Sequence, residues 1–435
     1  MSVAVVRWAM IQRRPETGLT TSKRRFQSNM PDKNVLVLGG GVAGLSAALE
    51  LARLGIGVDL VEKTSFLGGH AIQFSCKATD KCVKCGACVA EEKLEDVVRH
   101  SNIKLLPGSH VKKVTKKADR FSVTLQKTPE YITPQKCTGC GVCFEKCPSE
   151  GAIIRGFSKS NVPFYAVCEG KCLFVKDKSC NLCQEICPEN AITLDKKSCS
   201  YSCETDAIIV ATGFKAFSPE SKPYGYDIFD NVITNLEMER MLRQQSIASR
   251  PSDGKEAKKV AFIQCVGSRD AKLKHLWCSK VCCGSALRMA RLIKMRQPET
   301  DIAFFYIDVQ TFGRDFQNFY ENVQNDVRMI RAIPGDIFKT GDDRLRVNFF
   351  DNTAQDSIEE CFDIVVLSIG LGPGEDTEEL AELLNLEIAG SGFISASEDG
   401  IFTAGTAQRP MSIAETVADA GKAAWDTFKY LGIPQ

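Results

Sequence analysis

The chain has 435 residues, 44% of them hydrophobic, which predicts a globular protein of two or three domains with sizeable cores. Its 55 lysines and arginines nearly cancel its 54 aspartates and glutamates, so its charge gives no reason to expect nucleic acid or an anionic membrane surface as a partner. No apolar run approaches the roughly 20 residues that a membrane-spanning helix needs, so any membrane link must come through a partner.

Twenty cysteines are the unusual feature of the composition. Most stand in C-x-x-C or C-x-x-x-C spacings, and no secretory signal precedes them. Thiolates that bind metal in a reducing compartment fit this pattern better than disulfides do. We therefore expect a cytoplasmic protein that reaches a membrane through partners.

Residues 1–30 suggest a second location. They carry five arginines and a single acid, Glu16, as a mitochondrial transit peptide does, which makes the matrix of a mitochondrion or related organelle the alternative. Upstream sequence ahead of a true start at Met30, or a disordered tail, would explain the same composition. In each case the leader lies outside the expected folded domains.

The nucleotide-binding signature of the chain follows this leader. Val35–Leu38 is an apolar run typical of a buried strand, and three glycines at G-x-G-x-x-G spacing lie between it and a helix-forming segment. The first glycine makes the tight turn, the second lets the backbone approach a pyrophosphate, and the third allows close helix-to-sheet packing. The predicted site comprises Gly39, Gly41, Val42, Ala43 and Gly44.

The next strand, Gly57–Glu62, ends in an acid suited to a ribose hydroxyl pair. Lys63 and a glycine pair that ends at Gly69 follow, where a flavoprotein of this architecture closes over the pyrophosphate. Strand, helix and acid in this register predict a dinucleotide site. A glycine-rich turn in an ordinary α/β domain is the alternative.

A cysteine-rich insertion is expected over residues 76–205, which hold fifteen of the twenty cysteines. Within it, residues 103–127 alternate apolar and polar side chains and are expected to be strands of the flavin domain itself. The interrupted sheet resumes at residues 207–213, a buried strand that ends in Ala-Thr-Gly, so Thr212 and Gly213 join the predicted cofactor site.

Two ferredoxin-like runs lie in this insertion. The first has the C-x-x-C-x-x-C-x-x-x-C-P pattern, in which three cysteines bind one cubane and the fourth binds its neighbour. The second lacks its first cysteine, and we expect Cys172 to replace it, with Cys168 as the alternative. Zinc fits less well, because its four thiolates normally come as two separated pairs. The predicted ligands are Cys137, Cys140, Cys143 and Cys187 for one cluster, and Cys147, Cys172, Cys180 and Cys183 for the other.

A third group of cysteines precedes these runs. Cys82, Cys85 and Cys88 have the spacing of a cluster loop, but no Cys-Pro ending follows them. Another cluster could be completed by cysteines outside this loop, and free or structural cysteines are the alternative. The candidates for completing it are Cys76, Cys199 and Cys203.

A second α/β unit opens with the strand at residues 260–264. It runs into Cys265 instead of a glycine fingerprint, so the phosphate loop of a nicotinamide site is missing. Cys278 follows after twelve residues, and Cys282 and Cys283 come next. These four cysteines can bind one cubane if a helix start or turn splays the adjacent pair, which predicts a metal centre in place of a hydride donor.

Two closing segments, Asp363–Gly370 and Gly400–Thr406, are expected to return to the flavin domain. The second resembles the flavoprotein strand whose end reaches the ribityl chain, so Gly405 and Thr406 join the predicted site, although many such proteins have Asp at position 406. A terminal amphipathic helix is expected over residues 413–430. The predicted domains are residues 31–75 and 363–435 for the two parts of the FAD domain, 76–205 for the insertion, 206–258 for the return and linker, and 259–362 for the second α/β domain.

The chain resembles the flavoprotein A subunit of heterodisulfide reductases and its shorter relative in the quinone-interacting membrane-bound oxidoreductase of sulfate reducers. The similarity runs from about Asn34 to Gly432. It is carried by Phe262–Asp270, Trp277–Cys283, Cys172–Pro188 and Ala404–Gln408. It implies an α/β, thioredoxin-reductase-like fold of two dinucleotide domains with an inserted ferredoxin-like α+β segment, and a non-standard [4Fe-4S] site on the four cysteines of the second unit. The chain lacks the added ferredoxin modules of the long methanogen-type subunit, which favours the shorter relative.

The resemblance also implies an oxidoreductase that holds FAD and two to four [4Fe-4S] clusters. It would be a subunit of a redox complex and would relay electrons from a membrane quinone-binding partner to a soluble reductase such as adenylylsulfate reductase. Electron bifurcation at the flavin, as in a heterodisulfide reductase A subunit, is one alternative mechanism. Two rival hypotheses are a self-sufficient NAD(P)H oxidoreductase, which the missing glycine fingerprint disfavours, and a metal-binding scaffold without catalysis.

Overall fold

The computed structural model describes residues 33–432 except 162, 311, 312, 314 and 396–398. The leader expected over residues 1–30 lies outside the described residues. Within the part of the chain that is described, no helix is long and apolar enough to cross a bilayer.

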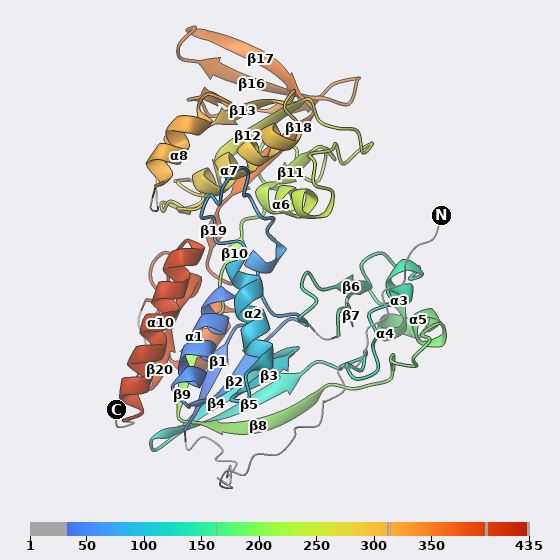
Figure 1. Ribbon diagram of the computed structural model, residues 1–435, viewed down its shortest axis with the longest axis vertical. Coiled ribbons are helices and arrows are strands. Elements are labelled where there is room, and N and C mark those ends of the chain that lie inside the picture. Colours follow the sequence, from blue (N-terminus) through green and yellow to red (C-terminus); the bar gives the residue numbers. More distant parts are fainter. Residues whose placement is uncertain (1–32, 162, 311–312, 314, 396–398, 433–435) are drawn as a thin grey trace, which may run out of the picture. The chain divides into compact units, whose positions relative to one another are not determined.

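A five-stranded parallel sheet organises the flavin half of the fold (Figure 1). Its order is β20-β9-β1-β2-β3, so segments from both ends of the chain meet in it. The apolar runs that predicted its central strands are fully buried, because both faces of the sheet are covered. The strands are β1 (Asn34–Leu38), β2 (Gly57–Glu62), β3 (Ile103–Pro107), β9 (Ala207–Val210) and β20 (Ile401–Thr403).

Helices cover one face of this sheet and a three-stranded antiparallel sheet covers the other. Val35 and Val37 pack with the helices, whereas Leu36 and Leu38 pack with the antiparallel strands, because successive strand residues point to opposite faces. The helices are α1 (Val42–Arg53), α2 (Val89–Arg99) and α10 (Ile413–Tyr430). The antiparallel strands are β4 (Ser109–Lys117), β5 (Arg120–Lys127) and β8 (Cys199–Thr205), in the order β4-β5-β8.

The strand β8 corrects one sequence-based boundary. We expected the cysteine-rich insertion to run to residue 205, but β8 pairs with β5 along its whole length, so the flavin half resumes at Cys199. This strand carries two cysteines, Cys199 and Cys203, among serines and other polar residues, so its composition resembles that of the cysteine-rich region. The short elements of the insertion are α3 (Val142–Glu145), β6 (Ile153–Arg155), β7 (Tyr165–Val167), α4 (Leu173–Asp177) and α5 (Leu182–Glu185).

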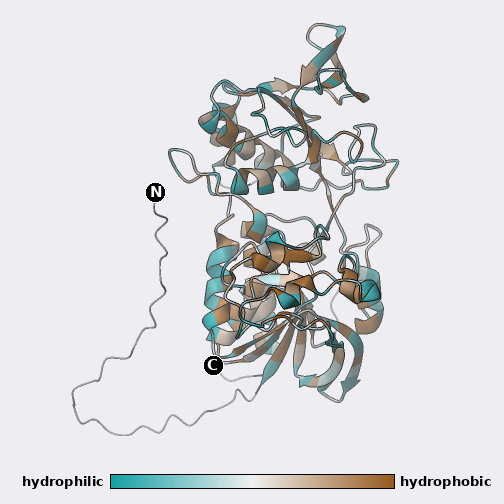
Figure 2. Ribbon diagram, turned by 90° about the vertical axis from the view of Figure 1, so that its right-hand side faces the viewer, coloured by the Kyte–Doolittle hydropathy of each residue, from teal (hydrophilic) through white to brown (hydrophobic). Residues whose placement is uncertain are grey.

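A second five-stranded parallel sheet, in the order β11-β18-β12-β13-β14, forms the other half. Figure 2 shows brown, hydrophobic segments among the strands of both halves. The strands of this second sheet are β11 (Val232–Thr234), β12 (Lys259–Val266), β13 (Asp301–Phe305), β14 (Arg328–Ile330) and β18 (Ile364–Ile369). The elements that cover it are α6 (Asn235–Gln244), α7 (Cys282–Arg296), α8 (Phe316–Val323), β15 (Ile337–Lys339), β16 (Leu345–Asp351) and β17 (Asp356–Phe362).

The position of β18 differs from our expectation. We expected Asp363–Gly370 to return to the flavin domain, but β18 lies between β11 and β12, with Val366 opposite Phe262. A fully buried, largely apolar strand fits the centre of either sheet, so its composition could not decide between them. The chain crosses back only at β19 (Leu371–Gly372), which pairs with β10 (Lys215–Ala216) and precedes α9 (Thr377–Leu384).

Candidate functional site

The predicted nucleotide residues lie at the carboxyl ends of β1, β2, β9 and β20. This edge is where open parallel sheets bind ligands. Gly39 has φ +111°, and a Cβ there would lie 2.3 Å from the Ala211 carbonyl oxygen. A Cβ on Gly44 would lie 1.8 Å from the Gly39 oxygen, so only glycine allows the helix to start this close to the turn. Thr212, which follows β9, is exposed at this edge.

The N-terminus of α1 is open toward the same edge. No described side chain caps it, and its first turn holds no acid. Its first N–H groups have no intrahelical partner and are suited to bind an anion. Gly41 and Gly69 pack against each other so closely that a Cβ on Gly69 would lie 2.9 Å from the Gly41 Cα. These residues fit the diphosphate of a dinucleotide.

Glu62 ends β2 as expected, and its buried carboxylate already accepts three hydrogen bonds. Its Oε2 accepts from the Gly40 N–H at 2.7 Å, and its Oε1 accepts from the N–H and hydroxyl of Thr64 at 2.8 and 2.7 Å. A carboxylate has about four lone-pair sites, so one remains for a ribose hydroxyl. Lys63, also predicted to bind the cofactor, is half-exposed and pairs with Asp376 at 2.6 Å.

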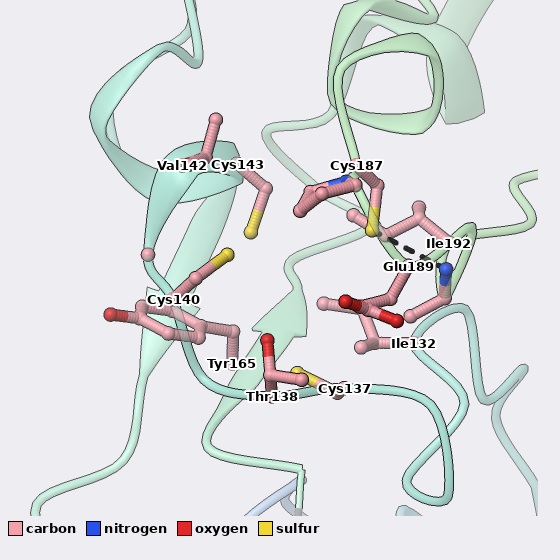
Figure 3. Close-up of a pocket in the computed structure, with 13 residues that line it drawn as sticks. Ile132, Cys137, Thr138, Cys140, Val142, Cys143, Tyr165, Cys187, Glu189 and Ile192 are labelled. Carbon is pink, nitrogen blue, oxygen red and sulfur yellow. Dashed lines mark hydrogen bonds between the residues drawn. The ribbon is translucent and has the colours of Figure 1, made fainter. Parts of the chain in front are cut away.

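Four of the predicted cluster ligands line one cavity of the insertion. They are Cys137, Cys140, Cys143 and Cys187. Figure 3 shows their sulfur atoms around a common space between two chain segments. Burial, together with the nearby thiols of Cys137 and Cys140, raises the pKa of Cys143 to about 11. The Ala191 N–H donates a hydrogen bond to the Cys187 Sγ at 3.3 Å.

The second predicted set lies around Cys183. Burial raises the pKa of Cys183 to about 11, and the nearby thiols of Cys172, Cys147, Cys143 and Cys180 contribute to this rise. Cys147 of the first run therefore lies near Cys183 of the second run, and Cys187 of the second run lines the cavity of the first. An exchange of fourth cysteines between paired ferredoxin runs would place these residues in this way.

The four cysteines of the second half also line a single cavity. Cys265 lies near the end of β12 with φ +60°, and Cys282 and Cys283 begin α7, so a helix start splays the adjacent pair. Complete burial raises the pKa of Cys282 well above its usual value, and burial raises that of Cys283 to about 11. Bound metal has to displace these protons, as in any thiolate site.

Polar groups lie beside these thiols. Arg269 binds Asp308 through two hydrogen bonds of 2.7 and 2.9 Å. Arg269 thereby lowers the pKa of Asp308. Burial raises the pKa of Cys265, and the nearby charge of Arg269 opposes this rise. The Lys280 N–H donates to the Cys278 Sγ at 3.2 Å. Charge-assisted and backbone donors of this kind stabilise negative charge on cluster sulfurs.

Two cysteines that could have completed the third group lie elsewhere. Cys199 and Cys203 belong to β8, and the Cys203 Sγ donates to the Val123 carbonyl oxygen at 3.7 Å. Among the described residues, no group of three or more His, Cys, Asp or Glu side chains is arranged to hold a single metal ion. In a cubane each thiolate binds its own iron, so its ligands stand farther apart than those of one ion.

Comparison with known proteins identifies the relatives of the chain. The family model for FAD dependent oxidoreductases matches residues 34–82. The A subunit of the H(2):CoB-CoM heterodisulfide,ferredoxin reductase of Methanothermobacter marburgensis is 36% identical over 417 residues, which are 90% of this chain and 63% of that protein. The iron-sulfur A subunit of the CoB–CoM heterodisulfide reductase of Methanocaldococcus jannaschii is 36% identical over 423 residues, with the same coverage. The chain is similar to heterodisulfide reductase A subunits over 90% of its length.

Solved structures confirm the predicted fold. The T. acidophilum thioredoxin reductase matches with a TM-score of 0.52 and 14% identity, over 92% of this chain and all of that one. The Lactococcus lactis thioredoxin reductase matches with a TM-score of 0.51 and 15% identity, over 92% and 99%. This chain therefore has the α/β fold of a thioredoxin reductase, and it spans slightly less than two thirds of the curated relatives' length.

Sequence reasoning missed two residues of this site. Asp419 on α10 accepts a hydrogen bond from the Gly405 N–H at 2.8 Å, beside Thr406, where many flavoproteins have Asp. Asn161 of the insertion binds both backbone groups of Leu67, at 2.8 and 3.2 Å, and so fixes the loop that leads to Gly69. An acid in an amphipathic helix and an asparagine in a polar loop gave no local signal.

Proposed function

We propose that this chain is an FAD- and [4Fe-4S]-containing electron-transfer subunit of a heterodisulfide reductase-like complex. The observation that carries the proposal is the cavity at the end of β12. Four cysteines line it, in the position where a second dinucleotide fold would have its phosphate-binding loop. Such an edge suits a metal cluster and offers a nicotinamide cofactor no glycine-rich loop.

The residues of the flavin half have separate roles in this proposal. The Gly39–Gly44 turn and the N-terminus of α1 bind the diphosphate, and Glu62 binds a ribose hydroxyl. Asp419 fixes the Gly405 backbone at the end of β20, where the ribityl chain is expected. Bound FAD supplies the exchange between two-electron and one-electron chemistry, while the protein supplies its orientation and environment.

The cysteine sets would hold the remaining centres. The two sets of the insertion suit paired ferredoxin-type clusters, because Cys187 lines the cavity of the first run and Cys147 lies near Cys183 of the second. The set of the second half suits a non-standard cluster, and two of its four thiols, those of Cys282 and Cys283, are buried. Burial and hydrogen bonds to the sulfurs are the means by which the protein sets the reduction potentials.

We further propose two partners, a soluble acceptor such as adenylylsulfate reductase and a membrane quinone-binding subunit. This assignment is supported by the sequence resemblance to the quinone-interacting oxidoreductase. The names of the curated relatives, which include a heterodisulfide and ferredoxin reductase, favour a second candidate, an electron-bifurcating flavoprotein of the heterodisulfide reductase type.

Anaerobic purification of the full chain with its native partners tests these proposals. We expect one FAD per chain, about twelve irons or more with matching acid-labile sulfide, and co-purifying redox subunits. If these include a quinone-binding membrane protein, the first candidate is supported, and a heterodisulfide-reducing protein supports the second. A colourless preparation without iron, or rapid reduction of the flavin by NADPH in the isolated chain, would contradict the proposal.

A further inference from the structure

The loop that carries Cys82, Cys85 and Cys88 repeats the backbone of the ferredoxin loop. In the run that starts at Cys137, left-handed conformations occur two and four residues after the first cysteine, at Gly139 (φ +71°) and Gly141 (φ +85°). In the run that starts at Cys82, they occur at the same two positions, Lys84 (φ +51°) and Gly86 (φ +76°). The ferredoxin loop uses these turns to bring three thiols to one cavity.

Lys84 is a costly residue for such a turn. A non-glycine residue in the left-handed region costs on the order of 1 kcal/mol or more, and strain of this kind tends to persist at functional sites. The Lys84 N–H donates to the Cys82 Sγ at 3.4 Å. The four-cysteine site of the second half shows the same device, because Lys280 has φ +68° and its N–H donates to the Cys278 Sγ. In both loops, a residue in the left-handed region donates its backbone N–H to the thiol of the cysteine two residues earlier.

Contacts hold this loop against the helix that carries the non-standard site. The Arg288 Nε donates to the Val83 carbonyl oxygen at 3.1 Å, and its Nη1 donates to the Gly284 carbonyl oxygen at 3.0 Å. Gly284 lies in the first turn of α7, directly after Cys282 and Cys283. One guanidinium therefore bridges the Cys82–Cys88 loop and the helix start that holds two cysteines of the other site.

Two ion pairs also join this loop and the residues just before it to the second half. Arg291 of α7 pairs with Asp80 at 3.3 Å, and Lys84 pairs with Asp315, next to α8, at 2.8 Å. On the flavin side, a Cβ on Gly86 would lie 3.1 Å from the side chain of Ile413, the first residue of α10. The loop thus contacts elements of both halves.

We propose that Cys82, Cys85 and Cys88 hold a further [4Fe-4S] cluster, which relays electrons between the flavin half and the four-cysteine site at the start of α7. The inference rests on the proposed function, because it adds a centre to that electron-transfer chain. Three ligands come from the loop, and the fourth iron takes a ligand from outside it. Each passage is a one-electron exchange between neighbouring centres, so no bond is made or broken.

The test is iron and acid-labile sulfide per chain in the anaerobically purified full chain. Cys85→Ser is expected to lose about four irons and the matching sulfide, with the flavin retained. Cys82→Ser, at an exposed side chain, repeats the test where a cavity cannot impair folding. Cys361→Ser, on β17, is the matched control and is expected to keep the full iron content.

The outcomes separate the two proposals. Electron paramagnetic resonance of the reduced wild type is expected to show one signal more than Cys85→Ser does. Unchanged iron and spectra in both loop variants would overturn the further cluster and leave the proposed function standing, as would zinc in place of iron at this loop. A wild-type chain with neither iron nor flavin would overturn the proposed function itself.

Discussion

After β1 of the first sheet, the chain turns through Gly39–Gly44. In the second sheet, β12 carries Cys265 near its end, and the chain turns at Gly267. Both turns are tight: a Cβ on Gly267 would lie 2.2 Å from the Phe217 ring, much as one on Gly39 would meet Ala211. The first edge offers backbone N–H groups to a ligand, and the second offers side-chain thiols. The same edge of a parallel sheet can thus present either an anion site or a thiolate site, depending on which residues the turn carries.

Gly44→Val should have the largest effect on the first edge, because a side chain at this position prevents the close approach of the α1 N-terminus to the Gly39 turn. The ideal Cβ position is 1.8 Å from a backbone oxygen, which cannot move as a flexible side chain could. We expect a purified chain without FAD, and a loss of stability of about 1–3 kcal/mol or more. Flavin content per chain is the measurement.

Gly421→Ala is the control for this variant. Gly421 lies within α10, and no described atom lies within 4 Å of its ideal Cβ position. Alanine there should leave the flavin in place and stabilise the helix by up to about 1 kcal/mol. Full flavin occupancy in Gly44→Val would show that the backbone approach at this edge is not required.

Glu239→Gln tests a buried ion pair that joins the two halves of the fold. Glu239 on α6 pairs with Lys77 at 2.6 Å, with 2% and 4% of the two side chains exposed, and it also accepts hydrogen bonds from Ser75 and Ser285. Loss of one partner leaves a buried, uncompensated ammonium, which costs about 3–5 kcal/mol. The midpoint of urea denaturation should fall accordingly.

The exposed pair of Lys422 and Asp426, at 2.6 Å on α10, is the control. Asp426→Asn should change stability by about 1 kcal/mol or less, because exposed ion pairs contribute little. Equal effects of Glu239→Gln and Asp426→Asn would show that the buried pair does not secure the two halves.

Arg269→Gln should have the smallest effect of these substitutions. It tests how the second edge sets the reduction potential of a cluster there. Arg269 lies close enough to Cys265 for its charge to oppose the rise in the pKa of this thiol that burial causes, so we expect it to stabilise the more negative, reduced form of a cluster there. Its loss should lower the reduction potential of this centre. A potentiometric titration followed by electron paramagnetic resonance measures the shift.

Arg328→Gln is the matched control for this potential. Arg328 also binds a carboxylate through two hydrogen bonds, to Asp301 at 2.9 and 3.0 Å, and it contributes to the same sheet through β14. Its loss should leave the potential unchanged. A raised potential in Arg269→Gln, or equal shifts in both variants, would contradict the assigned role of Arg269.

The sequence alone determined the features that depend on neighbouring residues. The glycine spacing at residues 39–44 required a strand, a tight turn and a helix, and these are present. The apolar periodicity of residues 413–430 predicted α10 with its observed bounds, and the Ser412–Glu415 capping box explains where it begins. Cysteine spacing predicted three sets of four, and two of these sets each line one cavity. Their role as cluster ligands stays a prediction.

Only the tertiary structure decided which distant segments meet. It placed β18 in the second sheet, Cys203 against Val123, and Asp419 beside the end of β20. The physical reason is that turn geometry and helix periodicity are fixed by residues close in sequence, whereas strand pairing and side-chain contacts depend on which apolar faces pack together. A buried strand or an isolated acid carries no local mark of its partner, so the assembled fold had to supply it.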